Sequence, residues 1–350
     1  MRTRLLISLA IIVCGQLRAQ TLGGSSTYNF LKLPNSPQLT ALGGINISQI
    51  GNDVSMSFGN PALLRSNMHT QTHLSFNSLK GGVSSYHLLS GYHVPSWQTN
   101  LAFGIQYLNY GNIVQTDESG NIYGSMRPSD YVIQASASRQ YMERWHYGAT
   151  LKFIHSSYGP YRSSGIALDV GISYFDSSRL LQISFVAKNM GIQLKRYSGS
   201  SGEELPFDME LGISKRLANA PLQFSLTVWN LQRFDIRYED TLFNQENGFD
   251  QNSNGHVFFD KLFRHVVLSA QCYPTDKVEL SLGYNFMRRK ELNLGNAGNG
   301  LNGFSAGAGI LFKKLQIRYA RSWYQRSLAY DQLGLSLRLG DYLGSGAGGK

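Results

Sequence analysis

Hydrophobic and polar residues alternate along most of this chain of 350 residues, beginning near residue 71. Between residues 101 and 107, every odd position holds a large apolar residue and every even position holds alanine, glycine or glutamine. Because successive side chains of a β-strand point to opposite faces, such a stretch predicts a strand with one apolar face and one polar or small face. The same alternation marks residues 145–153, 166–174, 278–286 and 332–339.

Fourteen segments of nine to thirteen residues carry this pattern. Strands of soluble proteins most often have about 5–6 residues, whereas a tilted transmembrane strand needs about 9–11. The even number of strands is typical of barrels in bacterial outer membranes. The pattern therefore predicts an all-β fold, a 14-stranded antiparallel transmembrane β-barrel. The expected strands are 71–79, 83–93, 98–110, 130–139, 145–156, 165–175, 180–190, 207–217, 222–233, 263–273, 277–288, 303–313, 315–323 and 328–339.

The connections between these segments alternate in length, which favours a barrel over a soluble β-sandwich. Outer-membrane barrels have short periplasmic turns and longer extracellular loops, whereas a sandwich has no reason to sort its loops in this way. Two links, 80–82 and 324–327, are short although they lie at the end of the barrel that carries the longer loops. The short links are 94–97, 140–144, 176–179, 218–221, 274–276 and Lys314, and the long links are 111–129, 157–164, 191–206, 234–262 and 289–302.

The first 69 residues differ from the alternating region. Residues 1–19 have the basic start, apolar stretch and small final residue of a secretory signal peptide. Residues 20–69 contain several glycines and prolines and no sustained period. Their apolar residues need burial, so we expect a hatch inside the barrel, the alternative being a periplasmic arm. The barrel is expected to span 70–340, with a tail at 341–350.

Composition excludes a disordered polyelectrolyte, a helical membrane protein and a disulfide-rich scaffold. Only 15% of the residues are charged, against about 25% in a typical soluble domain, and 37 residues are glycine. Outside the N-terminus no apolar run approaches the about 20 residues of a spanning helix. Without the signal peptide the chain keeps 29 basic and 22 acidic residues, a net charge of +7, and Cys272 is its one cysteine. The basic residues are scattered and no nucleic-acid-binding motif accompanies them, so we expect no nucleic-acid partner.

Motifs for catalysis and for cofactor binding are missing from the sequence, and we expect no enzyme activity and no cofactor. One loop resembles half of a calcium-binding loop, because oxygen-bearing side chains alternate before a glycine at position 255. Lys261 stands where a bidentate glutamate belongs, which favours an ordinary surface loop. The weak calcium candidates are Asp250, Asn252, Asn254 and Asp260.

Four charged residues fall on the polar face of predicted strands and are expected to point into the lumen. Charges inside a barrel are normally paired or hydrated, so they form either a structural network that holds the hatch or a selectivity ring. These residues are Lys152, Asp169, Glu279 and Arg338.

Seven short strings, in this order, resemble the PorQ family of the type IX secretion system. Three lie before the strands, at 25–36 (SSTYNFLKLPNS), 41–44 (ALGG) and 60–64 (NPALL). Four follow within or beside the strands, at 104–111 (GIQYLNYG), 151–154 (LKFI), 205–208 (LPFD) and 229–233 (WNLQR). The similarity runs from about Leu22 to Gly340, and the shorter strings also resemble PorV-like and fatty-acid-channel barrels.

The resemblance implies a 14-stranded, fatty-acid-channel-like barrel in the outer membrane of Bacteroidota. It implies PorZ-, PorU- and PorV-like partners in a complex that attaches secreted cargo to lipopolysaccharide at the cell surface. It further implies that the barrel tethers the PorZ-like protein in that complex and has no catalytic role of its own. The chain departs from the usual barrel by continuing past its last strand with ten residues.

Three functions follow from these observations. The first is a non-enzymatic barrel that anchors a surface partner through its long loops, where binding residues concentrate. The second is a channel for hydrophobic small molecules gated by the hatch. The third, an outer-membrane hydrolase, needs a catalytic set that the sequence does not display. Candidate partner contacts are the loop aromatics Tyr123, Tyr197, Tyr238, Phe243 and Phe249.

Overall fold

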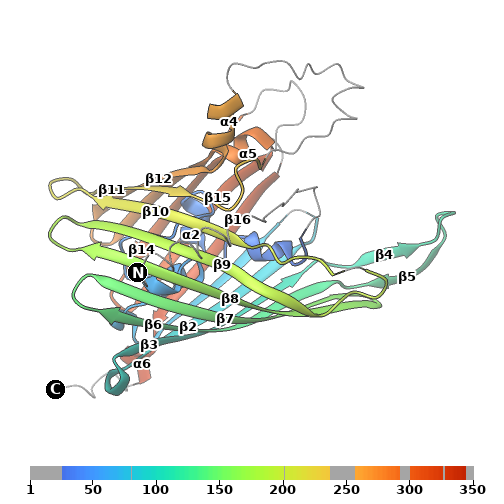
Figure 1. Ribbon diagram of the computed structural model, residues 1–350, viewed down its shortest axis with the longest axis horizontal. Coiled ribbons are helices and arrows are strands. Elements are labelled where there is room, and N and C mark those ends of the chain that lie inside the picture. Colours follow the sequence, from blue (N-terminus) through green and yellow to red (C-terminus); the bar gives the residue numbers. More distant parts are fainter. Residues whose placement is uncertain are drawn as a thin grey trace, which may run out of the picture.

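Fourteen long strands close into an antiparallel barrel in the computed structural model, which describes residues 26–79, 81–200, 202–236, 257–291, 300–325 and 328–343 (Figure 1). The barrel closes where the first strand pairs with the last, from Gln71 opposite Arg338 to Ser78 opposite Asp331. The predicted 14-stranded barrel is thus confirmed. Its strands are β1 (Gln71–Ser78), β2 (Ser84–Val94), β3 (Thr99–Asn109), β6 (Ser129–Tyr141), β7 (Trp145–Tyr158), β8 (Tyr161–Asp176), β9 (Leu181–Lys195), β10 (Asp208–Arg216), β11 (Leu222–Val228), β12 (Val266–Thr275), β13 (Val278–Asn285), β14 (Phe304–Leu311), β15 (Leu315–Gln325) and β16 (Leu328–Arg338).

The two faces of the wall carry opposite kinds of side chain. On β7, Tyr147, Leu151 and Phe153 are exposed on the outside, whereas Thr150 and Lys152 are buried inside. An apolar outer band and a polar interior are what a barrel needs when lipid surrounds it. Among the described residues no helix is long and apolar enough to cross a membrane.

Several long links contain structure that the alternation did not predict. The loop expected at 157–164 is a tight turn, because Tyr158 already pairs with Tyr161. The link 111–129 forms a separate hairpin, β4 (Ile113–Thr116) with β5 (Ile122–Met126), which projects far beyond the barrel (Figure 1). Its turn is held by Asp117, whose carboxylate accepts hydrogen bonds from Ser119 and Asn121. Among the described residues, three α-helices lie outside the wall, α4 (Val257–Arg264), α5 (Phe286–Glu291) and α6 (Gly340–Leu343), and the 3-10 helix η6 (Pro95–Trp97) forms the turn between β2 and β3.

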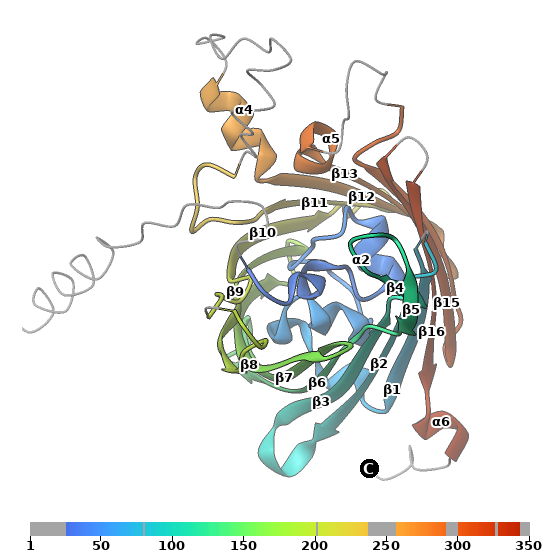
Figure 2. The same cartoon turned by 90° about the vertical axis from the view of Figure 1, so that its right-hand side faces the viewer.

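Residues 26–70, here called the inner segment, lie inside the ring of strands (Figure 2). They fold into short helices because caps and breakers follow one another closely. Ser36, Asp53 and Asn60 each accept a backbone hydrogen bond at a helix start, and Gly43 and Gly44 have φ angles of 89° and 88° that end α2. The helices are η2 (Asn29–Lys32), α2 (Pro37–Ala41), η3 (Val54–Phe58), η4 (Pro61–Leu63) and η5 (Ser66–Met68). The predicted signal peptide lies outside the described residues.

Candidate functional site

The apolar side chains of the inner segment form a small hydrophobic core within the polar lumen. Leu42, Val54, Met56 and Leu64 are almost fully buried and cluster with Leu89 on the inner face of the wall. Burial of such side chains is the main favourable contribution to packing. The lumen therefore holds a packed core where the inner faces of the strands alone would present polar groups.

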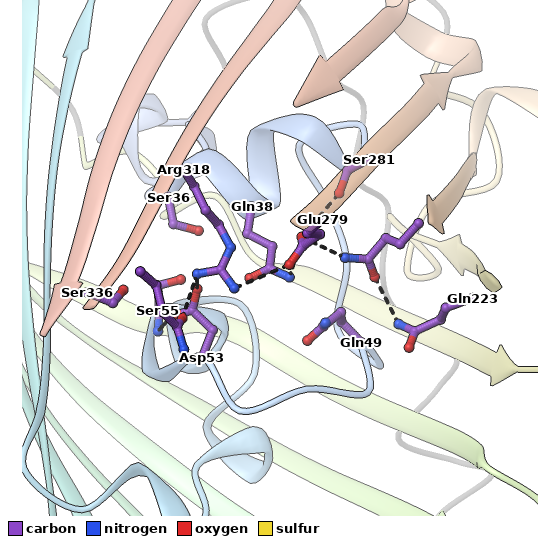
Figure 3. A network of polar contacts seen from close by, with 12 residues as sticks. Ser36, Gln38, Gln49, Asp53, Ser55, Gln223, Glu279, Ser281, Arg318 and Ser336 are labelled. Carbon is purple, nitrogen blue, oxygen red and sulfur yellow. Dashed lines mark hydrogen bonds and ion pairs between the residues drawn. The ribbon is translucent and has the colours of Figure 1, made fainter. Parts of the chain in front are cut away.

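An ion cluster ties the inner segment to the wall at the end of the strands that leads to the short turns (Figure 3). Arg318 of β15 donates to the carboxylate of Asp53 at 2.6 Å and to that of Glu279 of β13 at 3.3 Å. Glu279 also accepts hydrogen bonds from Gln38 of α2 at 3.2 Å and from Gln271 at 3.0 Å. All these side chains are buried. Because a buried charge without a partner is costly, this cluster fixes the position of the inner segment.

The opposite wall contacts the inner segment just as closely near the short turns. Gly148 of β7 leaves room for the backbone of Pro61, which an added Cβ would approach to 2.7 Å. Ser138 donates to the carbonyl oxygen of Leu64 at 3.0 Å. Arg65 reaches across to Gln182 of β9 at 3.1 Å. We call this region, where the inner segment contacts the wall on both sides, the short-turn half of the lumen.

A cavity of about 270 Å³ lies in the other half of the lumen, toward the long loops. One side is formed by apolar residues of the inner segment, including Leu31, Leu33 and Ile47. The facing side belongs to the wall and is polar and charged, with residues from β3, β7, β9 and β10. Aromatic residues at strand ends, such as Trp229 and Tyr324, complete the lining. We call this region the long-loop half, and its wall contributes Gln106, Lys152, Lys188, Asn189, Asp208 and Glu210.

Two ion pairs lie in the charged wall of the cavity. Lys152 lies 2.6 Å from Asp169, and Lys188 lies 3.3 Å from Glu210. Asn189 of β9, the residue after Lys188, holds the first pair in place, because its backbone N–H donates to Asp169 at 2.7 Å while its side chain accepts from Lys152 at 3.0 Å. Asn189 has a φ of 58° and lies at a register shift between β8 and β9. The wall beside the cavity is therefore irregular as well as charged.

The four charges assigned to the lumen from the sequence belong to different parts of this arrangement. Lys152 and Asp169 pair with each other beside the cavity, and Glu279 joins the Arg318 cluster in the short-turn half. Arg338 is the last residue of β16 and is half-buried.

Sequence reasoning missed four charged residues that build these clusters. Lys188, Glu210 and Arg318 lie at inward positions of predicted strands, so the alternation already marks them as lumen residues. Asp53 carried no such signal, because its partner Arg318 is 265 positions away in the chain.

The calcium candidates fall largely outside the described residues. Asp250, Asn252 and Asn254 are among these, and Asp260 lies in α4 with its carboxylate 2.9 Å from Arg264 and 3.2 Å from Lys290. Within the described ranges no cluster of His, Cys, Asp or Glu is suited to hold a metal ion. The calcium site stays a prediction.

Two of the five candidate partner contacts lie in described loops. Tyr123, in β5 of the projecting hairpin, is 69% exposed, and its neighbour Ile122 is 72% exposed. Tyr197 is half-buried, with its ring 6.0 Å from that of Tyr158. Hydrogen bonds from Asn121 hold the pKa of Asp117, at the hairpin turn, below its usual range. Tyr238, Phe243 and Phe249 lie outside the described residues.

The fold and the filled lumen together define an outer-membrane-type β-barrel of fourteen strands with residues 26–70 inside it. Its fold is similar to that of the toluene transporter TbuX of Ralstonia pickettii, with a TM-score of 0.51, 12% identity, and coverage of 88% of this chain and 98% of that one. At this identity the similarity establishes the fold alone.

Two further solved structures cover similar shares of the chain. The TodX monoaromatic hydrocarbon channel gives a TM-score of 0.49 at 12% identity, covering 87% of this chain and 98% of that one. A FadL homologue of Pseudomonas aeruginosa gives 0.45 at 9% identity, covering 86% and 97%. No protein-family model matches the chain, and no curated protein matches it in sequence.

Proposed function

We propose that this barrel carries small apolar or amphipathic molecules across the outer membrane, with the inner segment acting as a hatch. The observation that carries the proposal is the cavity of about 270 Å³ between the inner segment and the charged wall. A concave site with apolar surface and a few placed polar groups is the usual form of a small-molecule site. The fold shared with a toluene transporter supports the same direction.

The two sides of the cavity define the chemistry of its ligand. An apolar body would lie against Leu31, Leu33 and Ile47, while a polar group would meet the opposite wall. The Trp229 indole N–H is buried there with no hydrogen-bond partner among the described residues. Buried polar groups normally have partners, so a ligand with a hydroxyl or another oxygen acceptor suits this N–H. Passage beyond the cavity requires the short-turn half to open, because the inner segment fills it.

A substitution that fills the cavity tests this function. Leu33→Trp replaces an alkyl side chain that lines the cavity with a larger indole ring. We therefore expect uptake of toluene or of a medium-chain fatty acid to fall to the level of a strain without the protein. Leu231→Trp is the matched control, because Leu231 is exposed and does not line the cavity. Uptake that is unchanged by Leu33→Trp, with normal amounts of folded barrel, would exclude the cavity as part of the route.

A second function, anchoring of a surface protein, is favoured by the projecting hairpin. The hairpin presents Ile122 and Tyr123 to solvent well away from the barrel (Figure 1). Exposed aromatic side chains such as tyrosine are typical energetic contacts of protein interfaces. Together with the PorQ-like strings of the sequence, they support a tether for a PorZ-like protein in a complex with PorU- and PorV-like proteins at the lipopolysaccharide surface.

The anchoring function predicts loss of the partner from the cell surface when the hairpin contacts are removed. Replacing Ile122 and Tyr123 by serine should release the PorZ-like protein into the medium and deplete it from pull-downs of the barrel. Tyr141→Ser is the control, because Tyr141 is also exposed but lies at a short turn. Retention of the PorZ-like protein by the hairpin variant would mean either that the contact lies outside the hairpin or that the barrel does not anchor this protein. Uptake through the cavity should not change in either variant.

A further inference from the structure

Helix α4 has one face of large apolar side chains that the described protein leaves about half exposed, with the ring of Phe258 5.7 Å from that of Phe234. Phe258, Phe259, Leu262 and Phe263 follow the helical spacing of a single stripe, and 60%, 59%, 41% and 48% of their surfaces are exposed. A soluble surface rarely leaves four such residues together without a partner. The question is which surroundings cover this stripe.

The polar face of α4 fixes the orientation of the helix. Asp260 lies 2.9 Å from Arg264 on the same helix and 3.2 Å from Lys290 of α5. Lys261 lies 2.5 Å from Asp235, in the link that follows β11. Because these ion pairs attach the polar face to neighbouring parts of the protein, the apolar stripe is held facing away from them.

The apolar stripe continues directly into the lipid-facing wall of the barrel. The ring of Phe263 lies 5.2 Å from that of Phe286, which lies 4.6 Å from Tyr284 on β13. Tyr284 in turn lies 4.6 Å from Phe304 on β14. Leu282, two residues before Tyr284, is on the same outer face and is 61% exposed. An unbroken apolar surface therefore runs from the outer wall to the helix.

The position of α4 agrees with this continuity. Seen from the end where the β4–β5 hairpin projects, α4 lies outside the ring of strands, beyond β11 and β12, and not over the lumen (Figure 2). Aromatic residues at the ends of barrel strands mark the level of the lipid headgroups. A helix at this level, with an apolar stripe facing outward and basic residues on its polar side, has the features of a helix that lies in a membrane interface.

We infer that α4 is an interfacial helix whose stripe Phe258, Phe259, Leu262 and Phe263 inserts into the outer leaflet of the membrane, at the boundary between headgroups and acyl chains. Its occupant is lipid, because the stripe extends a surface that already faces lipid. This assignment is independent of both functions proposed above. It sets the depth of the barrel in the membrane at the β11–β14 side.

Depth-dependent quenching tests the assignment. In the full chain with Cys14→Ala and Cys272→Ala, a fluorophore is attached to Phe259→Cys and the protein is reconstituted in phosphatidylcholine vesicles with brominated acyl chains. We expect quenching at least ~3-fold stronger at this position than at Lys261→Cys on the polar face, because only the apolar stripe of an interfacial helix reaches the acyl chains. Leu282→Cys on the lipid-facing wall sets the upper limit, and Tyr123→Cys on the hairpin sets the lower limit.

The possible outcomes separate lipid from other occupants. Equal, weak quenching at positions 259 and 261 overturns the inference, whether the stripe faces water or is covered by protein. If cross-linking through Phe259→Cys then yields dimers, a second copy of the chain covers the stripe. If the unlabelled double variant Phe258→Ser and Phe259→Ser retains the barrel but is extracted from vesicles at the same detergent concentration as the unsubstituted protein, the helix contributes nothing to membrane attachment and the inference fails.

Discussion

The two halves of the lumen differ in how completely the inner segment fills them. In the short-turn half the segment touches opposite walls, through the Asp53–Arg318–Glu279 cluster on one side and the close contact of Pro61 with Gly148 on the other. In the long-loop half a cavity of about 270 Å³ remains between the segment and the wall. Both halves contain buried ion pairs, so charge alone does not distinguish them.

The difference lies in what the ion pairs connect. In the short-turn half Arg318 joins the wall to the inner segment, whereas in the long-loop half Lys188 and Glu210 join one strand of the wall to the next. The first kind of pair resists movement of the segment, and the second stabilises the wall beside a space. The lumen of this barrel therefore keeps a cavity at its long-loop end and is filled by the inner segment at its short-turn end.

The largest expected effect is on the cluster that holds the inner segment. Arg318→Met leaves the carboxylates of Asp53 and Glu279 buried without their cation, so we expect a loss of about 3–5 kcal/mol in the free energy of unfolding. Urea-induced unfolding of the barrel in detergent, followed by its mobility shift on gels, measures this loss. The matched control is Arg321→Met on the same strand, whose pair with Asp331 is exposed and 3.7 Å long. An equal effect of both variants would mean that Arg318 does not act as a buried anchor.

A smaller effect is expected where the inner segment touches the opposite wall. Gly148→Ala places a Cβ against the backbone of Pro61, and such overpacking typically costs about 1–3 kcal/mol. We expect the inner segment to shift, and a cysteine introduced at Ala62 to become reactive toward a water-soluble reagent. Gly124→Ala in the hairpin is the control, because its new Cβ meets only the end of the Gln115 side chain. If Ala62→Cys stays unreactive in the Gly148 variant, the short-turn half adapts without opening.

The fold was largely predictable from the sequence, because alternation and loop length are local properties. Strand β3, expected at 98–110, is found at Thr99–Asn109, and β16, expected at 328–339, is found at Leu328–Arg338. Lumen charges such as Lys152 and Asp169 follow from the same alternation, which also marks Lys188, Glu210 and Arg318.

What the sequence did not predict depends on contacts distant in the chain. Asp53 meets Arg318 across 265 positions, and no local pattern encodes that pairing. The cavity depends on where the inner segment comes to rest, which is likewise a property of the whole fold. The turn at Gly159 was missed because β7 and β8, with 14 and 16 residues, extend beyond the length that a membrane requires. The hairpin at 113–126 was missed because its strands, with 4 and 5 residues, are shorter than the alternating segments expected for the barrel.

The smallest expected effect lies in the long-loop half, and it tests the comparison directly. Lys188→Met leaves Glu210 without its cation, but the cavity beside the pair admits water, so we expect a loss of about 1–2 kcal/mol, below that of Arg318→Met. Adding Glu210→Gln should recover most of the loss, because a neutral amide is far cheaper to bury than a carboxylate. The same urea titration measures both variants. A loss as large as that for Arg318→Met would mean that the cavity wall is as dry and as closely packed as the short-turn half, and the two halves would then differ in shape alone.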